Sequence, residues 1–213
     1  MKNKLKDFVE ELAMTEVTKN VYNQYSYKIE ENKIRRKNLQ VYFEYMHKQK
    51  PEVLLVGEAP GYRGCRLTGV PFTSEYLLMN NMKGMKVFGR EAGYRLASNN
   101  EKLLKEATST IIWDTIIKYD IKSLGWNAFP FHPHKEGNFE SNRTPLKAEL
   151  TIGEKPLLKM IEIFNIKRIV AVGTKAEQTL AKLNINCIKV RHPAQGGKNE
   201  FVEGLRRIKG MEQ

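Results

Sequence analysis

Apolar residues recur at helical spacing through most of residues 3–48, a stretch that contains neither proline nor glycine. This pattern predicts two N-terminal helices, over residues 3–19 and 22–48. Pro51 then ends the second helix, because proline lacks the N–H group that a continuing helix needs. We expect residues 1–50 to form a helical extension that packs on a core formed by residues 51–213.

Four short apolar segments follow, each separated from the next by a longer stretch with helical or mixed spacing. They predict strands over residues 53–56, 124–129, 167–172 and 186–190. Helices are predicted over residues 101–119, 146–164, 175–183 (with Thr174 as N-cap) and 199–209, and short ones near 74–80 and 87–94. Strands that alternate with helices form a parallel sheet covered on both faces. We therefore predict an α/β fold, a three-layer αβα sandwich with a four-stranded parallel sheet, plus the N-terminal helices.

Polar or glycine-rich loops follow the first, second and last predicted strands. The first strand ends in Gly57 and a turn through Pro60 and Gly61, and residues 130–145 form a long polar loop after the second strand. Since the carboxyl ends of parallel strands meet at one edge of a sheet, side chains distant in sequence converge there. The set expected to converge is Glu58, Phe72, Asn127, His132, His134 and His192.

The charge balance favours a polyanionic partner. The 213 residues contain 36 Lys and Arg against 24 Asp and Glu, a formal net charge of +12. Nucleic acid is the leading candidate, although excess lysine also serves solubility. The sequence has no signal-peptide pattern and no run of about 18 apolar residues, so we expect a cytoplasmic protein without membrane association. We also expect a monomer.

The two cysteines, Cys65 and Cys187, lie far apart and fit no CxxC pattern. A disulfide framework and a cysteine metal site are therefore not expected. The segment His132-Pro133-His134 lacks acidic partners at ligand spacing, so support of the pocket or a phosphate contact is a better interpretation than a metal site. We expect no cofactor.

Several short motifs occur in a defined order: GEAPG at 57–61, TGVPF at 68–72, Asn127 after a strand, NRTP at 142–145 and HP at 192–193. In this combination, residues 52–208 resemble the uracil-DNA glycosylase superfamily. GEAPG and NRTP are most similar to the thermostable iron–sulfur members. Those members hold their cluster with four cysteines, which this chain does not have, so no cluster is expected.

The resemblance implies a DNA repair glycosylase that hydrolyses the N-glycosidic bond of a flipped uracil or related deaminated base, without lyase activity. It implies Glu58 and His192 as catalytic residues. The implied base-binding residues are Gly57, Ala59, Pro60, Gly61, Phe72 and Asn127. Candidate DNA contacts on the same edge are Arg66, Arg143, Arg191, Gln195 and Lys198.

Two departures from the family pattern leave alternatives open. Ala59 stands where the best-studied branch has a catalytic aspartate, and the loop HPAQGG lacks the apolar wedge that enters a duplex in relatives. These features favour a non-catalytic nucleic-acid-binding member of the same fold. A hydrolase of free nucleosides or nucleotides is a third possibility, for which the positive charge is excessive.

Overall fold

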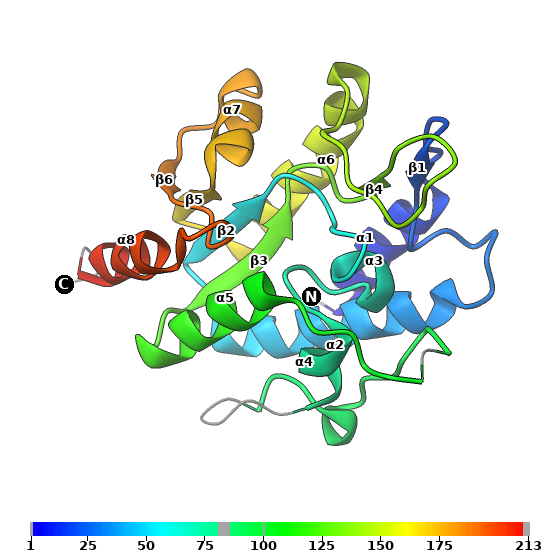
Figure 1. Cartoon of the computed structure of the whole chain (residues 1–213), viewed down its shortest axis with the longest axis horizontal. Coiled ribbons are helices and arrows are strands. Elements are labelled where there is room, and N and C mark those ends of the chain that lie inside the picture. The colour runs from blue at the N-terminus through cyan, green and yellow to red at the C-terminus, as the bar shows by residue number, and fades with distance from the viewer. Residues whose placement is uncertain (1, 81–85, 100, 211–213) are drawn as a thin grey trace.

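The structure is a computed structural model that describes residues 2–80, 86–99 and 101–210. Its centre is a four-stranded parallel sheet in the order β3-β2-β5-β6 (Figure 1). The strands are β2 (Val53–Gly57), β3 (Ser123–Asn127), β5 (Arg168–Val172) and β6 (Ile188–Val190). The predicted parallel sheet is therefore confirmed, with the second strand shifted so that it ends at Asn127.

Helices cover both faces of the sheet (Figure 1). The right-handed crossover from β2 to β3 places α5 (Ala107–Lys118) on one face of the sheet. The C-terminal helix α8 (Lys198–Gly210) lies on the same face and contacts α5. The helices α6 (Lys147–Phe164) and α7 (Thr174–Lys182) lie on the other face. The sheet carries apolar residues on both faces, and Val53 to Val56 are all buried, as a sheet covered by helices requires.

The N-terminal helices α1 (Lys2–Met14) and α2 (Asn32–Gln49) pack against each other and share one hydrophobic core with the sheet. Phe8 and Phe43 both contact Trp126 of β3. The Tyr42 hydroxyl accepts a hydrogen bond from the Gly125 N–H across 2.8 Å, which satisfies a donor on the outer edge of β3.

The prediction that a helix begins at residue 22 is wrong. Val21–Tyr22 is a short strand, β1, which pairs antiparallel with β4 (His132–Pro133). In the segment between β1 and α2, Asn23 Oδ1 accepts a hydrogen bond from the Tyr25 N–H across 2.9 Å, which stabilises a turn. The Asn23 amide also donates to the carbonyls of Leu12 and Thr15, which holds this segment against the end of α1. The first helix likewise ends at Met14 rather than at residue 19.

Tertiary contacts also shift the helix predicted over 101–119, which begins only at Ala107. The N–H of Leu104 donates to the carboxylate of Glu75, and this contact holds residues 101–106 out of the helix.

Short helices are α3 (Cys65–Thr68), α4 (Glu75–Met79) and the 3-10 turn η1 (Arg90–Ala92), which replaces the helix predicted near 87–94. Gly173, not Thr174, occupies the N-cap of α7. No helix in the described part of the chain combines the length and apolar character that a bilayer-spanning segment requires.

Candidate functional site

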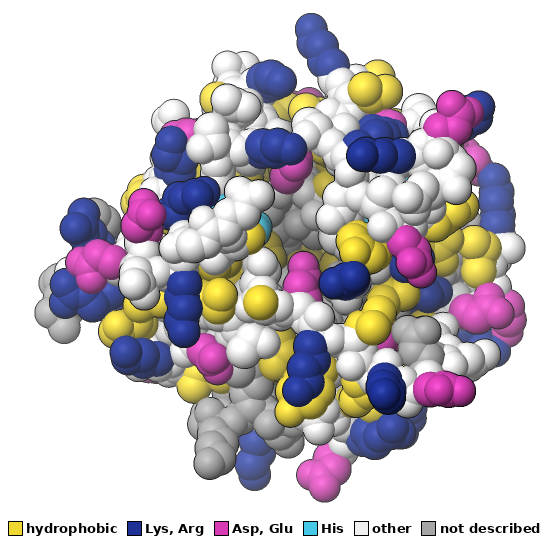
Figure 2. All heavy atoms as spheres, viewed as in Figure 1, with side chains coloured by type: hydrophobic (Ala, Val, Ile, Leu, Met, Phe, Trp, Pro, Cys, Tyr) yellow, Lys and Arg dark blue, Asp and Glu magenta, His cyan; other side chains and the backbone are white. Residues whose placement is uncertain are grey.

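A cavity of about 620 Å³ opens at the carboxyl ends of β2, β3 and β5. Figure 2 shows a hollow near the centre of this face, with Lys and Arg side chains spaced around it. Every residue expected to act in catalysis or base binding lines the cavity: Gly57, Glu58, Ala59, Pro60, Gly61, Phe72, Asn127 and His192. The topology thus brings together groups that are scattered over more than half of the chain.

The Phe72 ring packs on two glycines of adjacent strands. A Cβ placed on Gly57 would lie 3.0 Å from Cε1 and Cζ of this ring, and one on Gly125 would lie 2.8 Å from Cδ2. Phe72 has a φ of +53°, which is unusual for a bulky residue, and its carbonyl accepts a hydrogen bond from Trp113 Nε1 across 3.2 Å. The two glycines therefore make room for a flat ring at the base of the cavity.

Asn127 is the last residue of β3 and pairs in register with Gly57 of β2. Its side chain is only 4 % exposed, and its Oδ1 would lie 2.7 Å from a Cβ at Gly57. Among the residues that the structure describes, the Asn127 amide has no hydrogen-bond partner. Because Asn127 lines the cavity, its amide is available to bond a ligand there.

The Glu58–Gly61 turn is fixed by backbone and side-chain hydrogen bonds. The N–H groups of Ala128 and Phe129 donate to the carbonyls of Gly57 and Glu58 across 2.9 and 3.0 Å. Nδ1 of His132 lies 2.8 Å from the Pro60 carbonyl. These contacts hold the turn against the segment that follows β3.

His132 and His134 do not line the cavity: His132 contacts the turn at the Pro60 carbonyl, and His134 packs on His132. Burial lowers the pKa of His132 to about 4, so its imidazole is neutral at neutral pH. His134 stacks between His132 and Phe139, with ring centroids 5.9 and 4.3 Å apart. In the described residues, no group of three or more His, Cys, Asp and Glu side chains has a geometry that would hold a metal ion.

Glu58 is the carboxylate of the turn, with its side chain 21 % exposed. Burial raises its pKa, while the Lys175 ammonium, 3.7 Å from Oε2, and the Thr144 hydroxyl act in the opposite direction. Lys175 also donates to Thr144 Oγ1 across 2.6 Å. The effect of burial is the larger one and leaves the pKa of Glu58 above its ordinary value, while the ammonium limits that rise.

His192 follows β6 and packs against Gly173, where a Cβ would lie 3.0 Å from the Cβ of His192. The N–H of Ala194 donates to Nδ1 of His192 across 3.1 Å. Burial and the nearby Arg191 charge both lower the pKa of His192. A neutral imidazole whose Nδ1 accepts a bond carries its proton on Nε2, which is then a donor.

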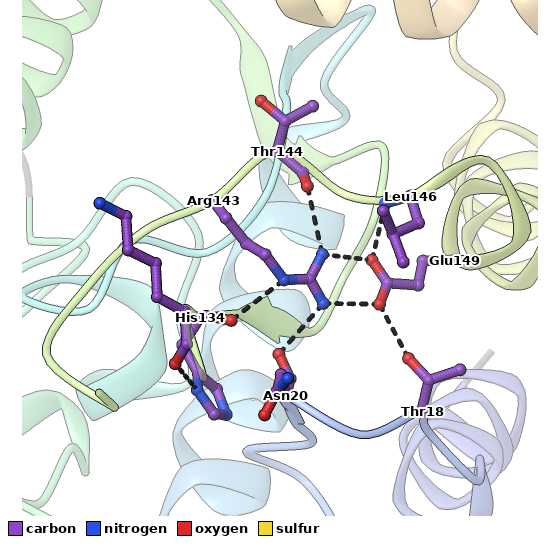
Figure 3. Close-up of polar contacts among 8 residues, drawn as sticks. Thr18, Asn20, His134, Arg143, Thr144, Leu146 and Glu149 are labelled. Atoms are coloured by element: carbon purple, nitrogen blue, oxygen red, sulfur yellow. Dashed lines mark hydrogen bonds and ion pairs between the residues drawn. The ribbon is translucent and has the colours of Figure 1, made fainter. Parts of the chain in front are cut away.

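Arg143, expected to contact DNA, is instead part of an internal network (Figure 3). Its guanidinium binds both oxygens of Glu149, at 2.6 and 2.7 Å, and donates to three backbone carbonyls, those of Asn20, His134 and Thr144. All five N–H donors of the guanidinium are thus used inside the protein, which leaves none for a phosphate. The contact between Arg143 and DNA stays a prediction that this geometry does not favour, although the residue borders the cavity.

The same network reaches the N-terminal segment. Thr18 donates to Glu149 Oε1 across 2.8 Å, and the Leu146 N–H donates to Oε2 across 2.7 Å. Burial raises the pKa of Glu149, but the Arg143 hydrogen bonds and these further donors outweigh it and leave the pKa below its ordinary value. Asn142, next to Arg143, accepts a hydrogen bond from the Tyr62 N–H across 3.0 Å. The network therefore connects the start of the chain to the loop that adjoins the Glu58–Gly61 turn.

The remaining expected DNA contacts differ in exposure. Arg191 and Gln195 are exposed and line the cavity, and Lys198 is exposed at the start of α8. Arg66 is half-buried and does not line the cavity, its Nε donates to the Tyr62 carbonyl across 3.0 Å, and burial lowers its pKa.

The cavity also contains polar residues that the sequence analysis missed, namely Glu106, Thr108, Ser109, Thr174 and Lys175. Glu106 and Ser109 were expected within a helix, where no motif distinguished them. Lys175 follows the strand–turn–helix junction at Gly173, and the position of that junction at the same sheet edge was the one available signal.

The parallel sheet and the polar cavity at its carboxyl edge define an α/β protein with a ligand site at the ends of its strands. The chain belongs to the uracil DNA glycosylase superfamily, whose family model matches residues 43–207. It is similar in structure to SMUG2 of Pedobacter heparinus, with a TM-score of 0.70 at 18 % sequence identity, over 99 % of this chain and 97 % of that chain. At this identity the likeness shows the fold alone. No curated protein matches the chain significantly.

Proposed function

We propose that this protein is a monofunctional DNA glycosylase that hydrolyses the N-glycosidic bond of a flipped uracil or a related deaminated base. One observation carries the proposal: the unpartnered Asn127 amide lies beside the Phe72 ring in the cavity that also contains Glu58 and His192. Phe72 can stack on a base and Asn127 can bond its edge. His192 and Glu58 can stabilise the negative and positive charges that form on the base and the sugar as the bond breaks.

Base selection rests on Phe72 and Asn127. The flipped base stacks on the Phe72 ring. The Asn127 amide then donates to O4 and accepts from N3–H, a pattern that uracil offers and cytosine does not. A bound base that cannot form both bonds would separate the amide from water without pairing it, so such a base is disfavoured.

Cleavage of the bond leaves negative charge on the base and positive charge on the sugar. The His192 Nε2–H donates to the developing oxyanion at O2, a contribution typically worth about 2.7–4 kcal/mol. The ionised Glu58 carboxylate offsets the charge on the sugar and orients the water that attacks C1′. Arg191 and Gln195 are exposed and line the cavity, so they can contact phosphates, as can the exposed Lys198 at the start of α8. The half-buried Arg66 is not part of the cavity lining.

Incubation with single- and double-stranded oligonucleotides that contain one uracil, followed by detection of abasic sites, tests the proposal. We expect cleavage by the wild type and a loss of about 10²–10⁴-fold in Glu58→Gln, with DNA binding largely kept. Glu52→Gln is the matched control, because Glu52 is exposed and precedes the opposite end of β2.

Folded protein that binds DNA but cleaves no uracil, hypoxanthine or xanthine substrate would contradict the proposal and favour the non-catalytic alternative. That alternative also predicts salt-dependent binding that Glu58→Gln leaves unchanged. Strong competition by free uridine would instead favour an enzyme of free nucleosides.

A further inference from the structure

Glu106 is a second carboxylate in the cavity, with no role in the mechanism above. It immediately precedes α5, and its Oε2 accepts a hydrogen bond from Ser109 Oγ across 2.7 Å. Oε1 has no hydrogen-bond partner within residues 2–80, 86–99 and 101–210. Burial raises the pKa of Glu106, while Ser109 and the Arg63 charge lower it. One oxygen is therefore fixed by α5 and the other is available to a ligand.

Two glycines of the turn make room for this carboxylate. A Cβ on Gly64 would collide with Oε2 of Glu106, and a Cβ on Gly61 would lie 3.5 Å from Oε1. Any side chain at position 64 would thus displace the carboxylate. Because positions 61 and 64 carry no side chains, the Glu106 carboxylate occupies the space beside them.

The orientation of the bound base decides which of its edges faces Glu106, and here the inference rests on the proposed function. His192 packs on Gly173 at the β5 side of the cavity and faces O2, and Asn127 at the end of β3 faces N3 and O4. In a pyrimidine ring C5 lies directly across from C2, so C5 points away from His192. The sugar on N1 leaves through the mouth. The C5–C6 edge then falls to the part of the lining formed by Gly61 and Glu106, which lie beside each other.

We propose that Glu106 is a specificity-determining residue that borders C5 of the flipped base and excludes pyrimidines with a substituent there, above all thymine. The C5–H of uracil is small and can approach a carboxylate oxygen as a weak donor. A methyl group needs additional volume and would remove water from the carboxylate without giving it a hydrogen bond. Uracil is accepted on this edge and the normal DNA base is rejected.

Single-turnover cleavage of duplexes with U·G and T·G mispairs tests the proposal on wild type, Glu106→Ala and Glu106→Gln. Glu101→Ala is the matched control, because Glu101 is an exposed carboxylate on the same approach to α5. We expect Glu106→Ala to raise the thymine-to-uracil rate ratio by at least about tenfold, the usual effect of room for one methyl group. Glu106→Gln has nearly the same size and should cleave uracil while it still rejects thymine.

Binding to non-cleavable duplexes, with 2′-fluoroarabino uridine or its 5-methyl analogue, separates this inference from the proposed function. A protein that binds the uridine duplex more tightly than the 5-methyl duplex, with a preference that Glu106→Ala reduces, supports the role of Glu106 even if nothing is cleaved. Three results would overturn it: equal treatment of uracil and thymine by the wild type, an unchanged ratio in Glu106→Ala, or loss of uracil cleavage in Glu106→Gln. If Glu106→Ala does not fold, the wild type and Glu106→Gln decide between these outcomes.

Discussion

The backbone N–H of Ala194 donates to Nδ1 of His192 across 3.1 Å, and this bond selects the tautomer of the imidazole. With Nδ1 occupied as an acceptor, the neutral ring presents Nε2–H to the cavity. The donor is therefore set by the loop that follows His192 rather than by a carboxylate partner. The side chains of this HPAQGG loop depart from the family pattern. The hydrogen bond to His192 comes from the backbone of Ala194 and does not depend on its side chain.

The protonation state of His192 follows from its surroundings. Burial and the Arg191 charge lower its pKa, so the neutral form persists below the ordinary value of about 6.5. Arg191→Met removes the charge but not the burial, and we expect the pKa of His192 to rise while it stays below the ordinary value. An NMR titration of the imidazole nitrogens measures both the pKa and the tautomer. Arg207→Met, on the far part of α8, should leave the titration unchanged, and an Nδ1–H tautomer would refute this account.

Lys175 controls the ionisation of Glu58. The ammonium lowers the pKa of this carboxyl against the effect of burial, so Lys175→Met should raise the pKa of Glu58. If the ionised carboxylate is the active form, the acidic limb of the single-turnover pH profile moves to higher pH, and the rate recovers at alkaline pH. Lys182→Met, an exposed lysine at the end of α7, is the control. A rate that falls equally at all pH values would mean that Lys175 acts in another way.

Gly57 allows Asn127 and Phe72 to approach each other. A Cβ there would lie 2.7 Å from Asn127 Oδ1 and 3.0 Å from the Phe72 ring, so both must move in Gly57→Ala. We expect a destabilisation of about 1–3 kcal/mol in denaturant unfolding, together with loss of uracil cleavage. Gly210→Ala has open space around its added methyl group and should change neither quantity. Normal activity of Gly57→Ala would exclude the proposed contact between Asn127 and the base.

The elements that define the sheet could be predicted because their signals are local. Short apolar runs such as residues 53–56, separated by helical spacing, identified the four parallel strands, and the common edge then grouped Glu58, Phe72, Asn127 and His192 in one place. Glu58, Asn127 and His192 lie at or just after strand ends, whereas Phe72 lies between α3 and α4. Their grouping could therefore be predicted from the order of strands and helices, even where the predicted boundaries were inexact.

Features that depend on tertiary partners could not be predicted in this way. The paired strands β1 and β4 have two residues each, too few for any periodicity to appear. Glu106 was placed within a helix, because the contact between Leu104 and Glu75 that delays α5 joins distant parts of the chain. Arg143 was predicted to be a surface cation because its hydrogen-bond acceptors lie on separate segments of the chain, at Asn20, His134 and Glu149, and only the fold brings them together.

The Arg143–Glu149 pair should support both stability and the catalytic turn. The Glu149 side chain is 1 % exposed, so removal of either partner leaves a buried charge without its counter-ion, a loss of about 3–5 kcal/mol. We expect Arg143→Leu and Glu149→Gln to lower the unfolding free energy by amounts of this order. The double variant should lose less than the sum of the two, because it leaves no unpaired charge. Denaturant unfolding of the four proteins measures this coupling.

Loss of the Arg143–Glu149 pair should also lower activity, through Asn142. This residue adjoins Arg143 and accepts a hydrogen bond from the Tyr62 N–H, just after the Glu58–Gly61 turn. Once Arg143 no longer anchors this loop, we expect a lower single-turnover rate under conditions in which the variant is still fully folded. The exposed pair of Glu203 and Arg206 on α8 provides the comparison, and Glu203→Gln should affect neither stability nor rate appreciably. A stability loss in Arg143→Leu without any change in rate would show that the network supports the fold alone and leaves the turn in place.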